Sequence, residues 1–186
     1  DVKACATSDV GDILSQITID GQELDATEQF ALLLSLDKYR ELLAELLLLV
    51  NEYPLLIYRI RLFSEHILRD SQSIYEYLHR HSKRIQWHIM RIYRNRNMIV
   101  HSGSYMPYRD IIVENLHFYV DVLMDTLIEY YHLGFLNHSS IYRNILSEEA
   151  NYYVTLGMSM NKKVKPTNIQ ISEDNALQLI FHNYSG

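Results

Sequence analysis

Residues that interrupt regular backbone are scarce along this chain. Its 186 residues include only six glycines and three prolines, whereas folds built from many short strands need such residues at their turns. Apolar residues recur instead at helical spacing, with short connections between the segments. The sequence therefore predicts an all-α fold, an antiparallel bundle of four to five helices.

Capping residues predict where the first two helices begin. Asp25 and Glu28 have the spacing of a capping box. We expect the helical region that follows to break near Leu36 and to end before Pro54. Pro54 itself suits the first turn of a second helix, where its missing N–H is not needed.

The third helix is expected to be the longest. Asp70 or Ser71 can cap its start, and Gly103 in left-handed geometry would stop it. Pro107 is expected to open the helix that follows. The fourth and fifth helices are predicted to cover residues 107–134 and 140–156.

The length of the chain suits one domain with a full hydrophobic core and is short for two. We assign residues 25–160 to the helical bundle. The sequence leaves the type of the flanking segments open: residues 1–24 fit a short helix or an edge strand, and the tail, residues 161–186, fits a short strand or helix.

Composition limits the cellular compartments and the classes of partner that this chain is expected to have. No apolar run approaches the ~18 residues of a membrane span, so no membrane partner is expected. The single cysteine, Cys5, excludes an internal disulfide and fits a reducing compartment, which predicts a cytoplasmic protein. The chain begins at Asp1 rather than at a methionine, and we expect it to be part of a longer protein.

Charge is distributed unevenly along the sequence. The formal net charge is −6, yet residues 77–109 contain seven Lys and Arg and no Asp or Glu, which leaves −13 for the rest. This concentrates positive potential around one helix, where a polyanion such as RNA could dock. The alternative is that these cations pair with acidic residues of neighbouring helices.

The most informative motif lies inside this basic window. Arg96 and Asn97 are followed by three residues and then by His101. Arginine is a fixed cation and histidine titrates near neutrality, and phosphodiester cleavage without a metal needs such a pair. Arg94 lies seven residues before His101 and therefore on the same helix face.

This motif resembles that of the HEPN superfamily, whose catalytic members carry Arg, a polar residue and a His four to six residues after the Arg. The stretch from Val100 to Gly103 looks like the Apea-like branch, found in bacterial anti-phage proteins. The resemblance covers roughly residues 27–135. It implies a HEPN-like bundle and a metal-independent endoribonuclease that attacks the phosphodiester with the ribose 2′-OH, as the effector of a defence or toxin-type protein.

The resemblance also implies roles for individual residues. His101 would act as general base or acid, Arg96 would hold the scissile phosphate, and Asn97 would orient the phosphate or the histidine. No cofactor is expected, and no metal, because the histidines lack metal-ligand spacing. The residues expected to bind RNA are Lys83, Arg84, Arg91 and Arg94.

Two faces of the third helix are apolar. Ile85, Ile92 and Ile99 recur every seven residues with Ile89 beside them, and we expect this face to point into the core and to keep Arg96 out of bulk water. The opposite face needs a second partner, either an extra helix or a second copy of the chain. It carries Trp87, Met90, Asn97 and His101, and we expect this face to belong to the interface of a symmetric dimer.

A homodimer through the motif helix would also resolve a conflict of geometry. Five residues place Arg96 and His101 about 140° apart on a straight helix. The two converge if the last turn unwinds near Gly103, or if two chains each contribute part of the site, as the resemblance implies. The alternative function is a non-catalytic HEPN-fold module that dimerises or binds protein or RNA.

Overall fold

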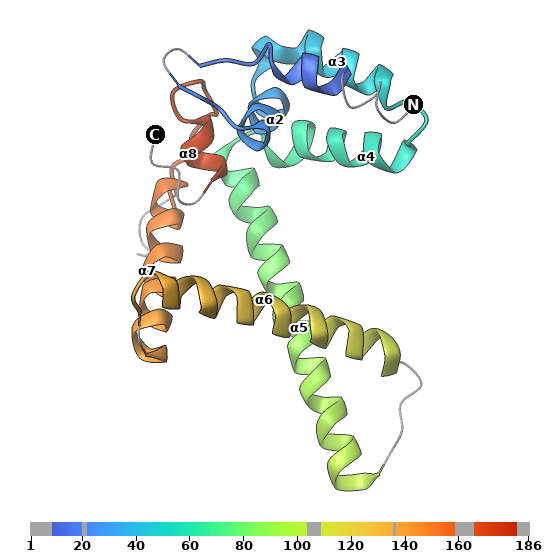
Figure 1. Ribbon diagram of the computed structural model, residues 1–186, viewed down its shortest axis with the longest axis vertical. Coiled ribbons are helices and arrows are strands. Elements are labelled where there is room, and N and C mark those ends of the chain that lie inside the picture. Colours follow the sequence, from blue (N-terminus) through green and yellow to red (C-terminus); the bar gives the residue numbers. More distant parts are fainter. Residues whose placement is uncertain (1–8, 20–21, 104–108, 136, 159–165, 182–186) are drawn as a thin grey trace. The chain divides into compact units, whose positions relative to one another are not determined.

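The computed structural model describes residues 9–19, 22–103, 109–135, 137–158 and 166–181. Within these ranges the regular structure is helical, and the only β pairing consists of isolated bridges (Figure 1). The predicted all-α fold class is therefore confirmed. The contacts group the chain into two units, one formed by residues 1–77 and 150–186 and the other by residues 78–149.

The first helices of the N-terminal unit follow the predicted pattern. In α2 (Ala26–Ser35) the Asp25 carboxylate accepts from the backbone N–H of Glu28, and the Glu28 side chain accepts from that of Asp25. Leu36 is extended and ends this helix, as predicted. The 3-10 turn η1 (Asp37–Tyr39) and helix α3 (Arg40–Leu49) follow.

Helix α4 (Pro54–Leu62) starts at Pro54, again as predicted. It passes directly into η2 (Phe63–Ile67), a π-helical turn in which the Leu68 N–H donates to the Phe63 carbonyl at 2.8 Å. This wider turn was not predicted, because a single i→i+5 turn is too short to leave a periodic pattern of its own in the sequence.

The core of this unit is built around α2. This helix contacts α3, η1, η2 and the short helix α8 (Ala176–Ile180), and Figure 1 shows these elements gathered near the start of α5. Residues 9–14 are helical, and Ile17 and Leu32 are fully buried. The two segments whose type the sequence left open thus each contain one short helix within otherwise irregular chain, and both contribute to the core.

Three helices make up or enter the second unit. They are α5 (Ser71–Ser102), which starts in the first unit, α6 (Arg109–His132) and α7 (His138–Thr155), which ends in the first unit. Gly103 and Gly134 follow α5 and α6 with φ of 61° and 89°. The predicted left-handed stop at Gly103 is confirmed, whereas Pro107 lies outside the described residues.

A buried junction fixes the start of α5. Asp70 caps the helix, since its Oδ1 accepts the Ser73 N–H at 2.8 Å, while its Oδ2 accepts Arg69 Nε at 3.0 Å. Ser71 is fully buried and bonds twice to Ile169: its N–H donates to the carbonyl at 3.0 Å, and its Oγ accepts the N–H at 2.9 Å. The tail is thereby attached to the first turn of α5.

We predict that Asp70→Ala lowers the free energy of unfolding by ~1–2 kcal/mol, the scale of a lost helix cap. Burial alone would raise the pKa of the Asp70 carboxyl, but hydrogen bonds from Ser73 and Arg69 outweigh it and leave the pKa below its ordinary value of 3.8. The ionised form thus stabilises the fold above that value, and this contribution is lost as the pH falls through the lowered pKa.

Urea unfolding of wild type and Asp70→Ala at a series of pH values measures this effect. The two stabilities should differ at neutral pH and converge in acid. Asp37→Ala is the matched control, because this aspartate is 91% exposed and pairs with Arg40 at the surface. Equal stability of the two variants at neutral pH would contradict the assigned cap.

Candidate functional site

The motif lies in the last two turns of α5, and this end of the helix is intact. Helical geometry continues to Ser102, and the N–H of Gly103 still donates to the carbonyl of Ile99 at 3.2 Å. The suggestion that the last turn unwinds near Gly103 is therefore wrong. Arg96 and His101 remain about 140° apart around the axis and ~7.5 Å apart along it.

Arg96 and Asn97 are held together. The Arg96 guanidinium donates from Nη1 to the Asn97 Oδ1 at 3.0 Å, so the neighbouring amide restricts the position of the guanidinium. Arg96 is exposed, and the prediction that it avoids bulk water is wrong for a single chain. His101 is exposed too, on another side of the helix, and one chain does not bring the two groups to a common point.

The predicted core stripe of α5 is only partly covered. Ile85 and Ile92 are half-buried, but Ile89 is 49% and Ile99 55% exposed. The periodicity identified the apolar face correctly, yet α6 covers only part of it, because it crosses α5 instead of running along it (Figure 1). Exposed Ile89, Tyr93 and Val100 form a stripe that also carries Arg96, at spacings of three and four residues.

A hydrogen bond marks the contact between α5 and α6. The Tyr119 hydroxyl lies 3.2 Å from His88 Nδ1. A hollow of about 290 Å³ beside it is lined by residues of both helices, among them Arg91, Ile112 and Asn115. His88 was not predicted to have a role, although its position between the two apolar faces of α5 could have indicated one.

Four basic side chains of α5 are not neutralised by ion pairs with the described residues. Lys83, Arg84, Arg91 and Arg94 are exposed, and none of them has an ion-pair partner within the described ranges. The reading in which these cations pair with acidic neighbouring helices is therefore not supported for these four. A positive surface remains on this side of the helix.

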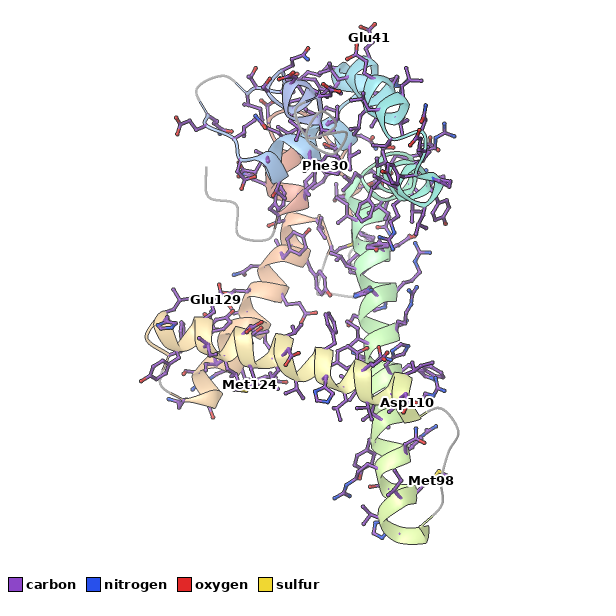
Figure 2. The ribbon with its side chains drawn as sticks, turned by 45° about the vertical axis from the view of Figure 1, so that its right-hand side comes forward. Phe30, Glu41, Met98, Asp110, Met124 and Glu129 are labelled. Atoms are coloured by element: carbon purple, nitrogen blue, oxygen red, sulfur yellow. The ribbon has the colours of Figure 1, made fainter. Side chains whose placement is uncertain are left out.

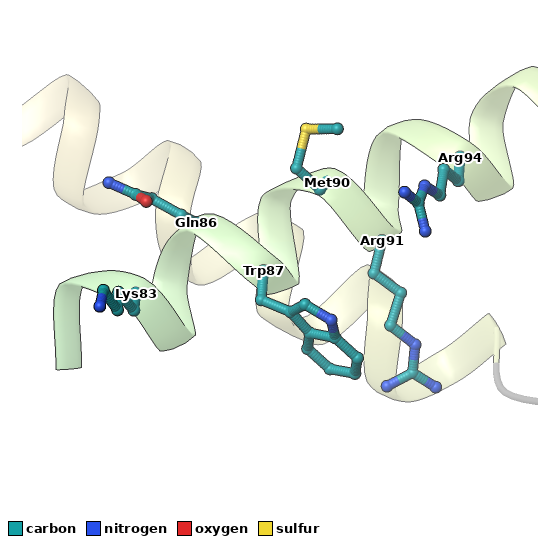
Figure 3. Close-up of a pocket in the computed structure, with 6 residues that line it drawn as sticks. All are labelled: Lys83, Gln86, Trp87, Met90, Arg91 and Arg94. Carbon is teal, nitrogen blue, oxygen red and sulfur yellow. The ribbon is translucent and has the colours of Figure 1, made fainter. Parts of the chain in front are cut away.

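Trp87 lies in the middle of this basic surface. Its side chain is 60% exposed and that of Met90 is 51% exposed, and the Arg91 guanidinium lies 5.5 Å from the centre of the indole. Figure 3 shows these side chains around a shallow hollow of about 330 Å³. The complete lining is Lys83, Gln86, Trp87, Met90, Arg91 and Arg94.

Helix α6 exposes apolar side chains around much of its circumference. Figure 2 shows its side chains projecting on all sides, with Met124 labelled near the middle. Ile111, Phe118 and Leu123 are each more than half exposed. A surface of this kind on a single chain marks an interaction site.

Neither a metal-binding cluster nor a membrane-spanning helix is found in the described part of the chain. It contains no group of three or more His, Cys, Asp or Glu side chains placed to hold a metal ion. None of its helices combines the length and the apolar character needed to cross a membrane.

Comparison of this chain with protein-family models, with curated proteins and with solved structures gives no match.

Proposed function

We propose that this chain is a metal-independent endoribonuclease of HEPN type, acting in the cytoplasm as the effector part of a longer defence or toxin-type protein. One observation carries the proposal: Arg96, Asn97 and His101 reach solvent at the end of a helix on which four exposed cations, Lys83, Arg84, Arg91 and Arg94, have no ion-pair partner among the described residues. A polyanionic substrate would satisfy those cations, and its phosphates would lie beside the motif.

The proposed reaction is a transesterification at phosphorus. His101 removes the proton from the ribose 2′-OH, the 2′ oxygen attacks the adjacent phosphorus, and the bond to the 5′ oxygen breaks. A protonated histidine returns a proton to that oxygen, which gives a 2′,3′-cyclic phosphate and a 5′-OH. Arg96 stabilises the charge on the phosphoryl oxygens, and Arg94, on the face of His101, holds a neighbouring phosphate.

Asn97 has a more specific role in this proposal. Its Oδ1 already accepts from Arg96, so we assign it to positioning the guanidinium rather than to contact with the histidine. The same bond leaves the other guanidinium nitrogens available for a phosphate.

Two chains would build the complete site. Arg96 shares its stripe with Ile89, Tyr93 and Val100, which are all about half exposed or more. We therefore place the interface of the proposed homodimer along this stripe of the motif helix rather than at Trp87, where the surrounding cations of two copies would repel one another. His101 lies outside this stripe, so we place the crossing of the two motif helices near their C-terminal ends, where Arg96 of one chain can act beside His101 of the other at the edge of the interface.

The second candidate function is a non-catalytic module that binds a partner through its apolar helices. The exposed apolar surface of α6 favours it, because catalysis by the motif does not require that surface. The substitutions below separate the two candidates, since an interaction module has no cleavage activity to lose.

We predict that His101→Ala and Arg96→Ala each reduce RNA cleavage by at least ~10²-fold, the scale for loss of an acid–base group or a transition-state charge partner. Both side chains are exposed, so melting temperature should change little. Arg59→Ala, at another exposed arginine, is the matched control. If the full-length protein cleaves no member of a broad RNA panel in a His101-dependent manner, the ribonuclease proposal fails.

Chelators should leave cleavage unchanged, because the proposed proton transfers use only protein side chains. The assay compares rates with and without EDTA and identifies the product ends. Loss of activity in EDTA with recovery on adding Mg²⁺ or Mn²⁺ would contradict the mechanism. Products ending in a 3′-OH would contradict it independently.

Val100→Asp should convert the proposed dimer to monomer, because it introduces two carboxylates into an apolar interface. Light scattering at micromolar concentration measures the mass of each variant. Leu48→Asp is the control, since Leu48 is 71% exposed on α3, a helix of the other unit. A monomeric wild type, or a Val100→Asp variant that stays dimeric, would exclude this interface.

A further inference from the structure

One exposed face of α5 combines an aromatic ring with cations. Lys83, Trp87, Arg94 and His101 follow one another at spacings of four and seven residues, so they lie along one side of the helix. The indole at the centre of this face is 60% exposed, although an apolar ring of this size is normally covered. A ligand with both a flat apolar surface and negative charge would match this face.

The contacts of the indole narrow the chemistry of that ligand. The Arg91 guanidinium lies 5.5 Å from the ring centre, which is within cation–π distance. Lys83 and Arg94 flank the ring in the same hollow, as Figure 3 shows, and neither has an ion-pair partner in the part of the chain that the structure describes. Proteins that bind single-stranded nucleic acid use this combination of an aromatic ring and cations, since the ring stacks on a base and the cations hold the adjacent phosphates.

We infer that Trp87 is a stacking platform for one unpaired base of single-stranded RNA, with the flanking phosphates held by Lys83, Arg91 and Arg94. The inference rests on the proposed function, which makes RNA the ligand, and it adds the manner of binding. A duplex keeps its bases stacked on one another and offers only its backbone, so it cannot use the indole in this way.

The same face leads to the motif. His101 lies fourteen residues after Trp87, so the two are ~21 Å apart along the helix and on nearly the same side. A strand held at Trp87 can therefore extend along the positive surface towards His101. Trp87 is a substrate-binding residue in this arrangement and takes no part in the chemical step.

The chain offers a direct probe, because Trp87 is its only tryptophan. The ligand for the test is a short 2′-O-methyl oligoadenylate, which lacks the 2′-OH needed for the proposed cleavage. Titration of this oligonucleotide into the full chain at low salt should quench the tryptophan fluorescence to saturation. The same sequence annealed to its complement should quench much less.

Fluorescence anisotropy of the labelled oligonucleotide measures its affinity for each variant of the protein. Trp87→Ala should weaken binding by roughly 5- to 150-fold, the range for loss of one base–aromatic stack, and Trp87→Phe should retain much of it. Tyr142→Ala should bind as the wild type does, since Tyr142 is a similarly exposed aromatic on α7. Lys83→Ala and Arg94→Ala should each reduce the salt dependence of binding by ~0.7 in slope.

Binding without quenching, equal affinity of wild type and Trp87→Ala, or equal quenching by the duplex would each overturn the inference. Tryptophan emission that shifts with protein concentration but does not change when RNA is added would place Trp87 between copies of the chain. This result would also overturn the inference. Cleavage assays test the ribonuclease proposal independently of this binding site. If the oligonucleotide quenches Trp87 but His101-dependent cleavage is absent, the stacking site stands and the ribonuclease proposal falls.

Discussion

The junction at Asp70 and Ser71 determines how the long helix of this protein is supported. Asp70 caps the first turn of α5, and Ser71 joins that turn to Ile169 through two hydrogen bonds. Both residues are buried, so the contact is protected from water. The opposite end of α5 has no comparable support in the described residues. The basic surface and the motif therefore lie on the part of the helix that its own chain covers least.

Charge and exposure on α5 have a common cause. A helix packed on all sides needs apolar residues around its circumference, whereas the stretch from Lys83 to Arg94 alternates apolar residues with cations. No carboxylate lies nearby in the sequence to neutralise them. Such a helix is stable in water because its cationic side chains remain solvated, and its exposed indole and thioether form the apolar part of this surface.

Local signals in the sequence predicted much of the fold. The capping box at Asp25, the proline at the start of α4 and the left-handed glycine after α5 each act through the backbone of a few residues, so a single sequence reveals them. The covered side of α5 could not be predicted in this way. Ile92 and Ile99 occupy equivalent positions in the heptad, yet one is half-buried and the other 55% exposed, because coverage depends on the path of α6.

In the candidate site too, contacts between neighbours in the sequence could be predicted, whereas relations that depend on other parts of the structure could not. Arg96 and Asn97 are neighbours in the sequence, and the hydrogen bond between their side chains restricts the position of the Arg96 guanidinium. The relation of Arg96 to His101 is different, because an unbroken helix keeps side chains five residues apart on different sides. Since α5 remains helical through Ser102, no rearrangement of that turn brings the two together within the described chain. A reaction that uses both groups at one phosphate must therefore draw them from two helices, and the exposed stripe that carries Arg96 is the surface on which a second copy can supply the other.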